Sequence, residues 1–330
     1  MALSYSQFLD FLVATPSLEE MLLAEGFPQI PQHQQDARIA TMPRLSRVSL
    51  TGSSPDVIAI LQDVVLPPQL VLFLYCDSDD DTFTELIASL NTIPHRFSNA
   101  TLPPFSLEIT EGIDGTSVDL KSWESDEMQG THSVRFDDSV RAPALNIHFE
   151  ASSLDPSDVF LALQEARDVL SLVEVRELVL GVDDPGEHAW SAGMWLDSFR
   201  AFHAVQILQV THTDATNALF DALAEVGNTL FPDLHTLHIS KVHLVRIYPA
   251  RGSLSFFSTF KAVLEERKAQ GRGLLTLYIS RCEIWRRWVQ DIDDVVPEVK
   301  WDGIEEGLAP DVHQGVDWAE LRARLGWGST

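Results

Sequence analysis

The sequence has little cysteine and no long apolar run. Its two cysteines, Cys76 and Cys282, lie 206 residues apart, a spacing that supports neither a disulfide framework nor a zinc site. No stretch of about 18 consecutive apolar residues occurs, so a transmembrane helix is not expected. The N-terminus lacks the basic residues, apolar stretch and cleavage site of a secretory signal. These absences predict a cytoplasmic or nuclear protein.

Basic residues are also scarce. The 330 residues include 23 Lys and Arg against 49 Asp and Glu, which gives a formal net charge of −26. Such a charge repels phosphate backbones and anionic lipid, so neither nucleic acid nor a membrane is an expected partner. It favours protein partners with basic patches, although acidity that serves solubility alone explains the composition equally well.

Motifs for cofactor or nucleophile chemistry are missing. The sequence contains no GxSxG, no P-loop and no dinucleotide fingerprint. Asp77-x-Asp79-x-Asp81 opens like a calcium loop, but Thr82 replaces the glycine of the turn and Ala88 replaces the bidentate glutamate. We therefore expect no metal, no cofactor and no catalytic residue, and we predict that the chain is not an enzyme.

The histidines give no metal signature either. The densest group has no HExxH spacing and no cysteine or carboxylate at ligand spacing, and it comprises His203, His212, His235, His238 and His243. Surface or half-buried histidines are the simpler interpretation.

The sequence does contain a repeated unit with the pattern apolar-x-x-apolar-x-apolar. The nine units begin at Leu18, Leu45, Leu70, Ala144, Val175, Val205, Leu234, Leu274 and Val296. The last two apolar residues of each unit are two apart and share one side of a strand. The common spacing is close to the roughly 20–29 residues of leucine-rich repeats.

Helical patterns separate these strands. Ser54-Pro55-Asp56 and Asp155-Pro156 carry capping signals, Thr213 or Asp214 opens a third helix, and a fourth follows Ser253 or Ser255 and ends at Gly271. Alternating strands and helices predict parallel strands with helical crossovers.

The predicted fold is therefore an α/β, irregular, leucine-rich-repeat-like solenoid over residues 1–303. Its parallel strands would lie on the concave side and its helices on the convex side. Residues 105–149 interrupt the spacing and predict an irregular β-rich portion, with strands at 105–109 and 134–136. Residues 304–330 predict a C-terminal cap or tail. A compact doubly wound α/β domain is the alternative, and the lack of a glycine-rich strand-to-helix turn disfavours it.

In a solenoid, the side chains between and just before the paired apolar residues project from the concave face of the sheet. They mix polar, apolar and aromatic types without one dominant charge, as a protein-contact surface can. These predicted binding residues are Arg47, Ser49, Asn146, His148, Glu177, Val179, Ile207, Gln209, Thr236, His238, Thr276 and Tyr278. Exposed strand faces without a partner are the competing interpretation.

Three segments carry a resemblance to a known family. They are Gly273-Leu274-Leu275-Thr276-Leu277-Tyr278-Ile279-Ser280-Arg281-Cys282 with Val299-Lys300-Trp301-Asp302-Gly303, then Phe231-Pro232-Asp233-Leu234-His235-Thr236-Leu237, and Phe8-Leu9-Asp10-Phe11-Leu12 with Thr15-Pro16-Ser17-Leu18-Glu19-Glu20. From about residue 5 to 303 the chain resembles the F-box proteins with leucine-rich-repeat-like regions of mushroom-forming fungi. That resemblance implies a substrate-recognition subunit of a cullin-type ubiquitin ligase, in which the F-box docks an adaptor and the repeats choose the target.

No F-box is visible in this sequence, so adaptor docking is assigned to no residue and depends on a segment upstream. The predicted function is a protein–protein interaction module, the substrate-recognition repeat region of an F-box-type ubiquitin ligase subunit. Its protein target is unidentified. The alternatives are an orphan repeat scaffold without a ligase role and a hydrolase in a compact α/β fold, built around His212 or His238. We expect Trp285-Arg286-Arg287-Trp288 to pack its tryptophans against the end of the repeat core, with the arginines in solvent.

Overall fold

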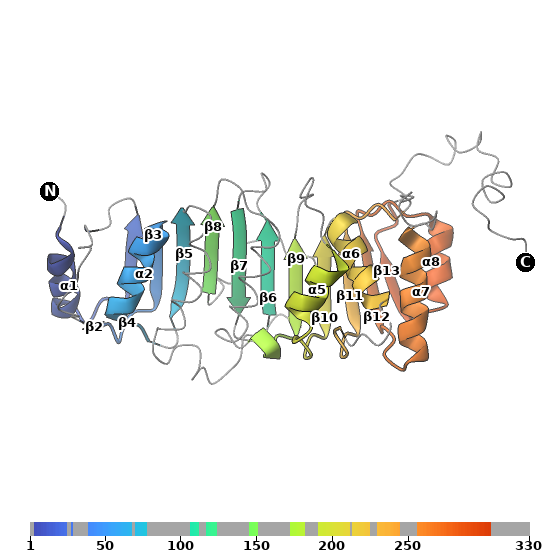
Figure 1. Cartoon of the computed structure of the whole chain (residues 1–330), viewed down its shortest axis with the longest axis horizontal. Coiled ribbons are helices and arrows are strands. Elements are labelled where there is room, and N and C mark those ends of the chain that lie inside the picture. Colours follow the sequence, from blue (N-terminus) through green and yellow to red (C-terminus); the bar gives the residue numbers. More distant parts are fainter. Residues whose placement is uncertain are drawn as a thin grey trace, which may run out of the picture.

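The structure of the protein is a computed structural model, a mixed α/β arrangement with an open sheet (Figure 1). It describes residues 3–24, 28, 39–67, 70–77, 106–111, 117–123, 145–150, 172–181, 191–211, 213–224, 230–244 and 256–304. Within these ranges the helices are α1 (Tyr5–Ala14), α2 (Ser54–Asp63), α5 (Ala192–Phe199), α6 (Thr213–Ala224), α7 (Phe256–Ala269) and α8 (Arg286–Asp293), with a 3-10 turn at Leu172–Glu174. No described helix is both long and apolar enough to cross a membrane.

Eleven described strands form one sheet in the order β1-β3-β5-β8-β7-β6-β9-β10-β11-β12-β13. Their bounds are β1 Glu20–Ala24, β3 Arg47–Ser53, β5 Val71–Asp77, β6 Ser106–Glu111, β7 Ser117–Trp123, β8 Leu145–Glu150, β9 Glu177–Gly181, β10 Ile207–Thr211, β11 Thr236–Ser240, β12 Thr276–Ser280 and β13 Glu298–Trp301. A separate parallel pair joins β2 (Ala40–Thr41) to β4 (Val64–Val65). The described strands close no barrel, because β1 and β13 lie at opposite edges.

The sheet is parallel except at β7, which pairs antiparallel with both β6 and β8. The expectation of parallel strands is therefore confirmed on both sides of β7 and wrong at β7 itself. The spatial order of β6, β7 and β8 is also the reverse of their order in the chain. Only residues 112–116 connect β6 to β7, which is long enough for an antiparallel turn and too short for a parallel crossover.

The irregular portion at 105–149 contains three strands, one of which the sequence did not indicate. The strand expected at 105–109 corresponds to β6, and the one expected at 134–136 lies outside the described residues. The strand β7 was missed because its apolar residues do not form the repeated unit.

The buried side of the sheet consists of apolar columns that cross neighbouring strands. Leu208 of β10 pairs with Leu178 of β9 and Leu237 of β11, and all three are almost completely buried. Each strand adds one residue to each column, so the apolar side chains of one strand are buried partly by those of its neighbours. Figure 1 shows α2, α5 and α6 on one side of this sheet.

The predicted unit beginning at Leu70 is wrong by one residue in β5. Leu72 and Leu74 are buried in the apolar columns, whereas Phe73 and Tyr75 are half-buried on the opposite side. The strand reads Leu-Phe-Leu-Tyr, so both alternating sets are apolar and the sequence pattern does not distinguish them.

The helix termini follow their capping residues. The N-cap of α2 is Ser53, whose side chain accepts from the Asp56 N–H, so the cap lies one residue before the predicted Ser54. Helix α7 ends in a Schellman motif at Gly271, which has a φ of 74°, as the glycine predicted. The helix predicted after Asp155-Pro156 and the C-terminal cap predicted over 304–330 lie outside the described residues, apart from residue 304.

Aromatic packing dominates the side of the molecule that contains α5 to α8. Trp195 is fully buried, and its ring centroid lies 5.1 Å from that of Phe199. Near α8, Trp288 stacks on Phe257 at 4.3 Å. The prediction for Trp285 to Trp288 is confirmed in outline, because both tryptophans are half-buried and the two intervening arginines are exposed.

Candidate functional site

The face of the sheet opposite the buried columns collects the predicted binding residues. We call it the ladder face, and by strand register its middle row contains Leu22, Ser49, Phe73, Asn146, Lys121, Glu108, Val179, Gln209, His238, Tyr278 and Lys300. The row on the amino-terminal side contains Arg47, Glu177, Ile207, Thr236 and Thr276. His148 pairs with Tyr75 in the row on the other side. All twelve predicted residues therefore share one face; Asn146 and His148 are placed by strand register alone.

Sequence reasoning missed several residues of this face. Phe73 and Tyr75 were assigned to the core because of the register error in β5. Glu298 and Lys300 of β13 occupy the rows of Thr276 and Tyr278. Their alternation with Val299 and Trp301 was visible in the sequence and could have identified them.

At the β1 to β5 end, the ladder face is apolar and aromatic. Leu22 is 69% exposed, which is unusual for a leucine in a strand. The Arg47 guanidinium lies 5.6 Å from the centroid of the Phe73 ring, and this contact combines apolar packing with a cation–π attraction. This end offers a contact surface for apolar side chains.

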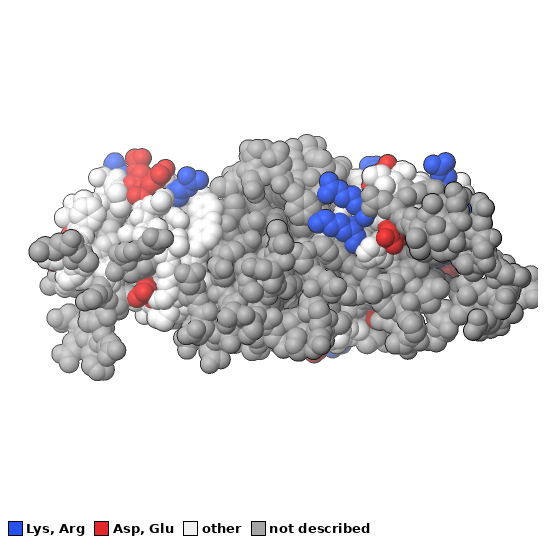
Figure 2. Space-filling view, turned by 90° about the horizontal axis from the view of Figure 1, so that it is seen from above, with Lys and Arg blue, Asp and Glu red and all other residues white. Residues whose placement is uncertain are grey.

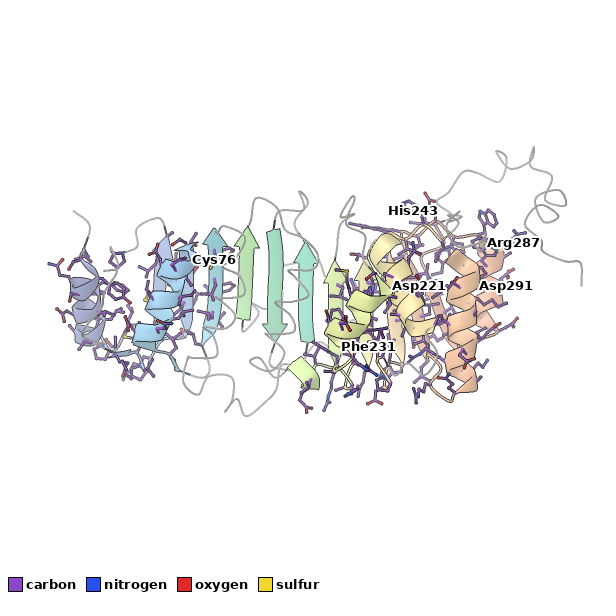
Figure 3. All side chains as sticks on the ribbon, in the orientation of Figure 1. Cys76, Asp221, Phe231, His243, Arg287 and Asp291 are labelled. Carbon is purple, nitrogen blue, oxygen red and sulfur yellow. The ribbon has the colours of Figure 1, made fainter. Side chains whose placement is uncertain are left out.

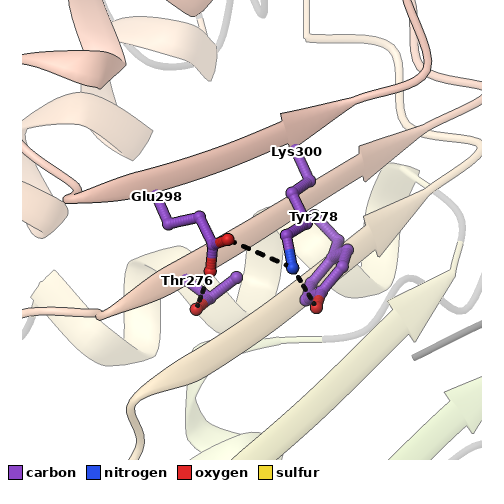
Figure 4. A network of polar contacts seen from close by, with 4 residues as sticks. All are labelled: Thr276, Tyr278, Glu298 and Lys300. Carbon is purple, nitrogen blue, oxygen red and sulfur yellow. Dashed lines mark hydrogen bonds and ion pairs between the residues drawn. The ribbon is translucent and has the colours of Figure 1, made fainter. Parts of the chain in front are cut away.

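At the β12 to β13 end, the ladder face carries a polar network (Figure 4). Thr276 Oγ1 donates to Glu298 Oε2 at 3.0 Å, and the ammonium of Lys300 lies 3.2 Å from Glu298 Oε1. Lys300 Nζ also donates to the Tyr278 hydroxyl at 3.1 Å and lies 4.9 Å from the ring centroid. The hydrogen bonds to Tyr278 and Glu298 raise the pKa of Lys300, so its ammonium is charged at neutral pH and forms an ion pair with the Glu298 carboxylate.

His238 lies next to this network and is nearly buried. Its Nε2 is 3.1 Å from Ser280 Oγ, and its ring centroid is 5.5 Å from that of Tyr278. Burial lowers the pKa of His238 to about 4, so the imidazole is neutral at pH 7. His238 and Thr236 are only 8% and 9% exposed, so they contribute little accessible area to the ladder face.

Glu177 of β9 is half-buried on the same face. Burial raises the pKa of its carboxyl group. Among the middle-row side chains that the structure describes, the exposed ones, Leu22 and Lys300, lie at the two ends of the sheet, and the least accessible one is His238 of β11.

The histidines do not assemble into a metal site within the described residues. His203 is exposed, and His243 Nδ1 lies 2.9 Å from Glu283 Oε2 in an ion pair with exposed side chains. No group of three or more His, Cys, Asp or Glu side chains in the described ranges is arranged to hold a metal ion. His212, one of the two histidines of the hydrolase alternative, lies outside the described residues.

Two of these histidines contact a hydroxyl group: His238 Nε2 lies 3.1 Å from Ser280 Oγ, and His235 Nδ1 lies 3.0 Å from Oγ1 of its chain neighbour Thr236. A serine hydrolase also needs a group that orients the imidazole and donors that stabilise an oxyanion. Within the described ranges, no carboxylate hydrogen-bonds to the other ring nitrogen of His238. Ser280 and His238 therefore form a serine–histidine pair on the ladder face without the orienting carboxylate of a catalytic triad.

Two comparisons of the sequence with known proteins found no match. No protein-family model matches the chain, and no curated protein is similar enough in sequence to be identified as its relative.

Proposed function

We propose that this chain is a protein–protein interaction module, an irregular leucine-rich-repeat-like solenoid that binds its partner through the ladder face. The observation that carries the proposal is the register of the eleven strands, which aligns polar, apolar and aromatic residue types in rows on one face. Stable protein interfaces bury roughly 800 Å² from each partner, which is more than one loop supplies and within reach of a continuous sheet face. An apolar end and a polar end give this face the mixed character of a protein-contact surface.

The proposal extends to the substrate-recognition region of an F-box-type ubiquitin ligase subunit, acting in the cytosol or nucleus. Its support is the resemblance carried by residues 273–282 and 299–303, which contribute to β12 and β13. Tyr278 and Lys300 in these segments belong to the ladder face. Under this proposal the repeats select the target, and adaptor docking, which requires an F-box, is assigned to no residue of this sequence. The non-enzymatic character of the chain is part of the same proposal.

Affinity purification of the full chain with paired variants tests the proposal. S49R/Q209R places two arginines on the ladder face, and Q62R/Q290R places two on exposed positions of α2 and α8. We expect proteins that the wild-type chain captures to be lost with S49R/Q209R and retained with Q62R/Q290R. Equal capture by both variants contradicts a binding role for the ladder face. Partners that include a cullin adaptor support the ligase role, whereas a stable partner set without one favours the orphan scaffold.

A serine hydrolase is the second candidate function, favoured by the 3.1 Å contact between His238 Nε2 and Ser280 Oγ. A fluorophosphonate probe tests it directly, because such probes label an activated serine. Labelling of the wild-type chain that disappears in Ser280→Ala and His238→Gln would establish the hydrolase and contradict the non-enzymatic proposal. No labelling at Ser280 removes this candidate.

A further inference from the structure

Two cationic residues occupy left-handed backbone positions at the carboxyl ends of adjacent strands. Lys241 follows β11 with a φ of 56°, and Arg281 follows β12 with a φ of 51°. The equivalent position after β13 is Gly303, with a φ of 78°. Glycine adopts this conformation without steric cost, whereas lysine and arginine do not. The chain therefore keeps long cationic side chains where the backbone favours glycine.

Short contacts hold both positions in place. The Lys241 N–H donates to the Ser280 carbonyl at 3.2 Å, and the Arg281 N–H donates to Asp302 Oδ2 at 2.7 Å. One residue pair further on, Glu283 donates its N–H to the Val242 carbonyl at 3.0 Å. The backbone is thus fixed, and the strained conformations are a stable property of this edge.

The side chains of Lys241 and Arg281 are exposed, and neither forms an ion pair with a described residue. Arg287, at the start of α8, is also exposed, and its guanidinium lies 4.8 Å from the Trp285 ring centroid. Figure 3 places Arg287 and His243 towards the same edge of the molecule. Figure 2, which looks onto this edge, shows lysine and arginine side chains over the C-terminal part with a few acidic ones beside them, and others over the N-terminal part.

The segment that contains Arg281 and Arg287 is less acidic than the chain as a whole. Residues 256–304 contain eight Lys and Arg and eight Asp and Glu, whereas the whole chain carries a net charge of −26. The Asp302 carboxylate at this edge accepts from the backbone N–H groups of Arg281 and Ile304. The side chains of Lys241 and Arg281 thus remain without an ion pair among the described residues and attract an acidic ligand, since cations pair well with carboxylates. A long polyanion such as nucleic acid would be repelled by the remaining acidic surface.

We propose that Lys241, Arg281 and Arg287, together with the Trp285 ring, form a basic rim that binds an acidic segment of a partner protein. The rim is separate from the ladder face and does not depend on it. Carboxylates of the segment pair with the three cations, and Trp285 adds an apolar contact at one end. This binding role explains why charged residues, and not glycine, occupy the left-handed positions 241 and 281.

The test uses the full chain and a short fluorescein-labelled peptide of alternating glutamate and glycine. K241G/R281G removes two rim charges and relieves two left-handed residues. The control R44Q/R200Q removes two exposed charges that precede strands β3 and β10, at the opposite edge of the sheet. We expect K241G/R281G to weaken peptide binding about fivefold and the control to leave it unchanged. Added salt should weaken the wild-type binding.

A stability measurement separates binding from folding. Because glycine suits both positions, K241G/R281G should have a Tm equal to or above that of the wild type. If this variant folds poorly, K241N/R281N and the single change Arg287→Gln provide the same comparison, since asparagine tolerates left-handed backbone. Unchanged peptide binding in folded rim variants overturns the proposal. Tighter rim-dependent binding of an oligothymidylate of equal charge also overturns it, in favour of nucleic acid.

Discussion

The two flanks of the sheet use the same architecture with different side chains. The N-terminal flank, residues 3–77, buries few aromatic rings and presents Leu22 and Phe73 on the ladder face. The C-terminal flank, residues 172–304, packs most of the described buried rings and presents the Tyr278 and Lys300 network. One continuous sheet therefore presents apolar side chains at one end and a hydrogen-bonded polar network at the other.

Exposed apolar residues sharpen the contrast. Five of the eight large apolar side chains that the described residues expose lie in the first 39 residues: Leu3, Phe11, Val13, Leu22 and Ile39. The C-terminal flank instead exposes arginines and acids on α8. We therefore expect the C-terminal flank to be more stable than the N-terminal flank, because its buried aromatic side chains remove more apolar area from water.

The largest expected effect is Trp195→Ala in the aromatic core. Trp195 is fully buried against Phe199, so its removal leaves a cavity and should lower the free energy of unfolding by about 4 kcal/mol. Urea denaturation measures the loss. The matched change Trp288→Ala removes a half-buried ring and should cost about 2 kcal/mol. Equal losses at the two positions would contradict the expectation that the fully buried ring contributes more stability than the half-buried one.

The next effect concerns Arg267, which ties α7 to the turn before β11. Its guanidinium donates to the carbonyls of Leu230, Phe231 and Leu234 at 2.9 to 3.4 Å. Burial lowers the pKa of Arg267 to about 10, so it remains charged at pH 7. Arg267→Met should cost about 3 kcal/mol, because these carbonyls lose their donor.

Urea denaturation of Arg267→Met and of the exposed control Arg272→Met checks this prediction. The control should change the free energy of unfolding by less than about 0.5 kcal/mol. A loss of similar size in both variants would mean that the carbonyl contacts contribute little.

A smaller effect should appear as a pH dependence of the C-terminal flank. The pKa of His238 is about 4 in the folded chain and about 6.5 when unfolded, so the unfolded state binds more protons between these values. The stabilisation is nearly complete at pH 7 and decreases as the pH falls towards 4, with about 2 kcal/mol lost between pH 7 and pH 5. Unfolding measured at pH 7 and pH 5 should show a steeper loss for the wild type than for His238→Gln. Identical slopes would rule out His238 as the source.

The smallest expected effect lies in the N-terminal flank. The Tyr5 hydroxyl donates to Asp63 Oδ2 at 2.8 Å and lies 3.0 Å from the Ala59 carbonyl, which ties α1 to α2. Tyr5→Phe should cost about 1 kcal/mol in chemical denaturation. Burial raises the pKa of Tyr5, so the wild type should also lose stability above about pH 10, as the unfolded tyrosine ionises first. A Tyr5→Phe variant with wild-type stability at every pH would contradict this contribution.

The sequence predicted the strand register of the C-terminal flank better than that of the N-terminal flank. The units beginning at Val205, Leu234 and Leu274 produced β10, β11 and β12 in the expected register, since only one of their alternating sets is apolar. In β5 both sets are apolar, and the register prediction failed by one residue.

The reversed order of β6, β7 and β8 could not be read from the sequence. Spacing along the chain indicates where strands occur, but not which neighbour each one pairs with. The side-chain contacts within the ladder face could not be predicted for the same reason. The 3.1 Å approach of Lys300 to Tyr278 depends on strand register across β12 and β13, which residue types alone do not reveal.

The ladder face as a protein-binding surface is tested most directly by site-specific photocrosslinking in cells. A benzoylphenylalanine at position 73 or 278 samples the two ends of this face, and the same residue at position 62 or 290 samples α2 and α8. We predict crosslinks to a common partner protein from positions 73 and 278, and none to that protein from positions 62 and 290. Crosslinks to the partner that arise only from the helix positions would contradict the account.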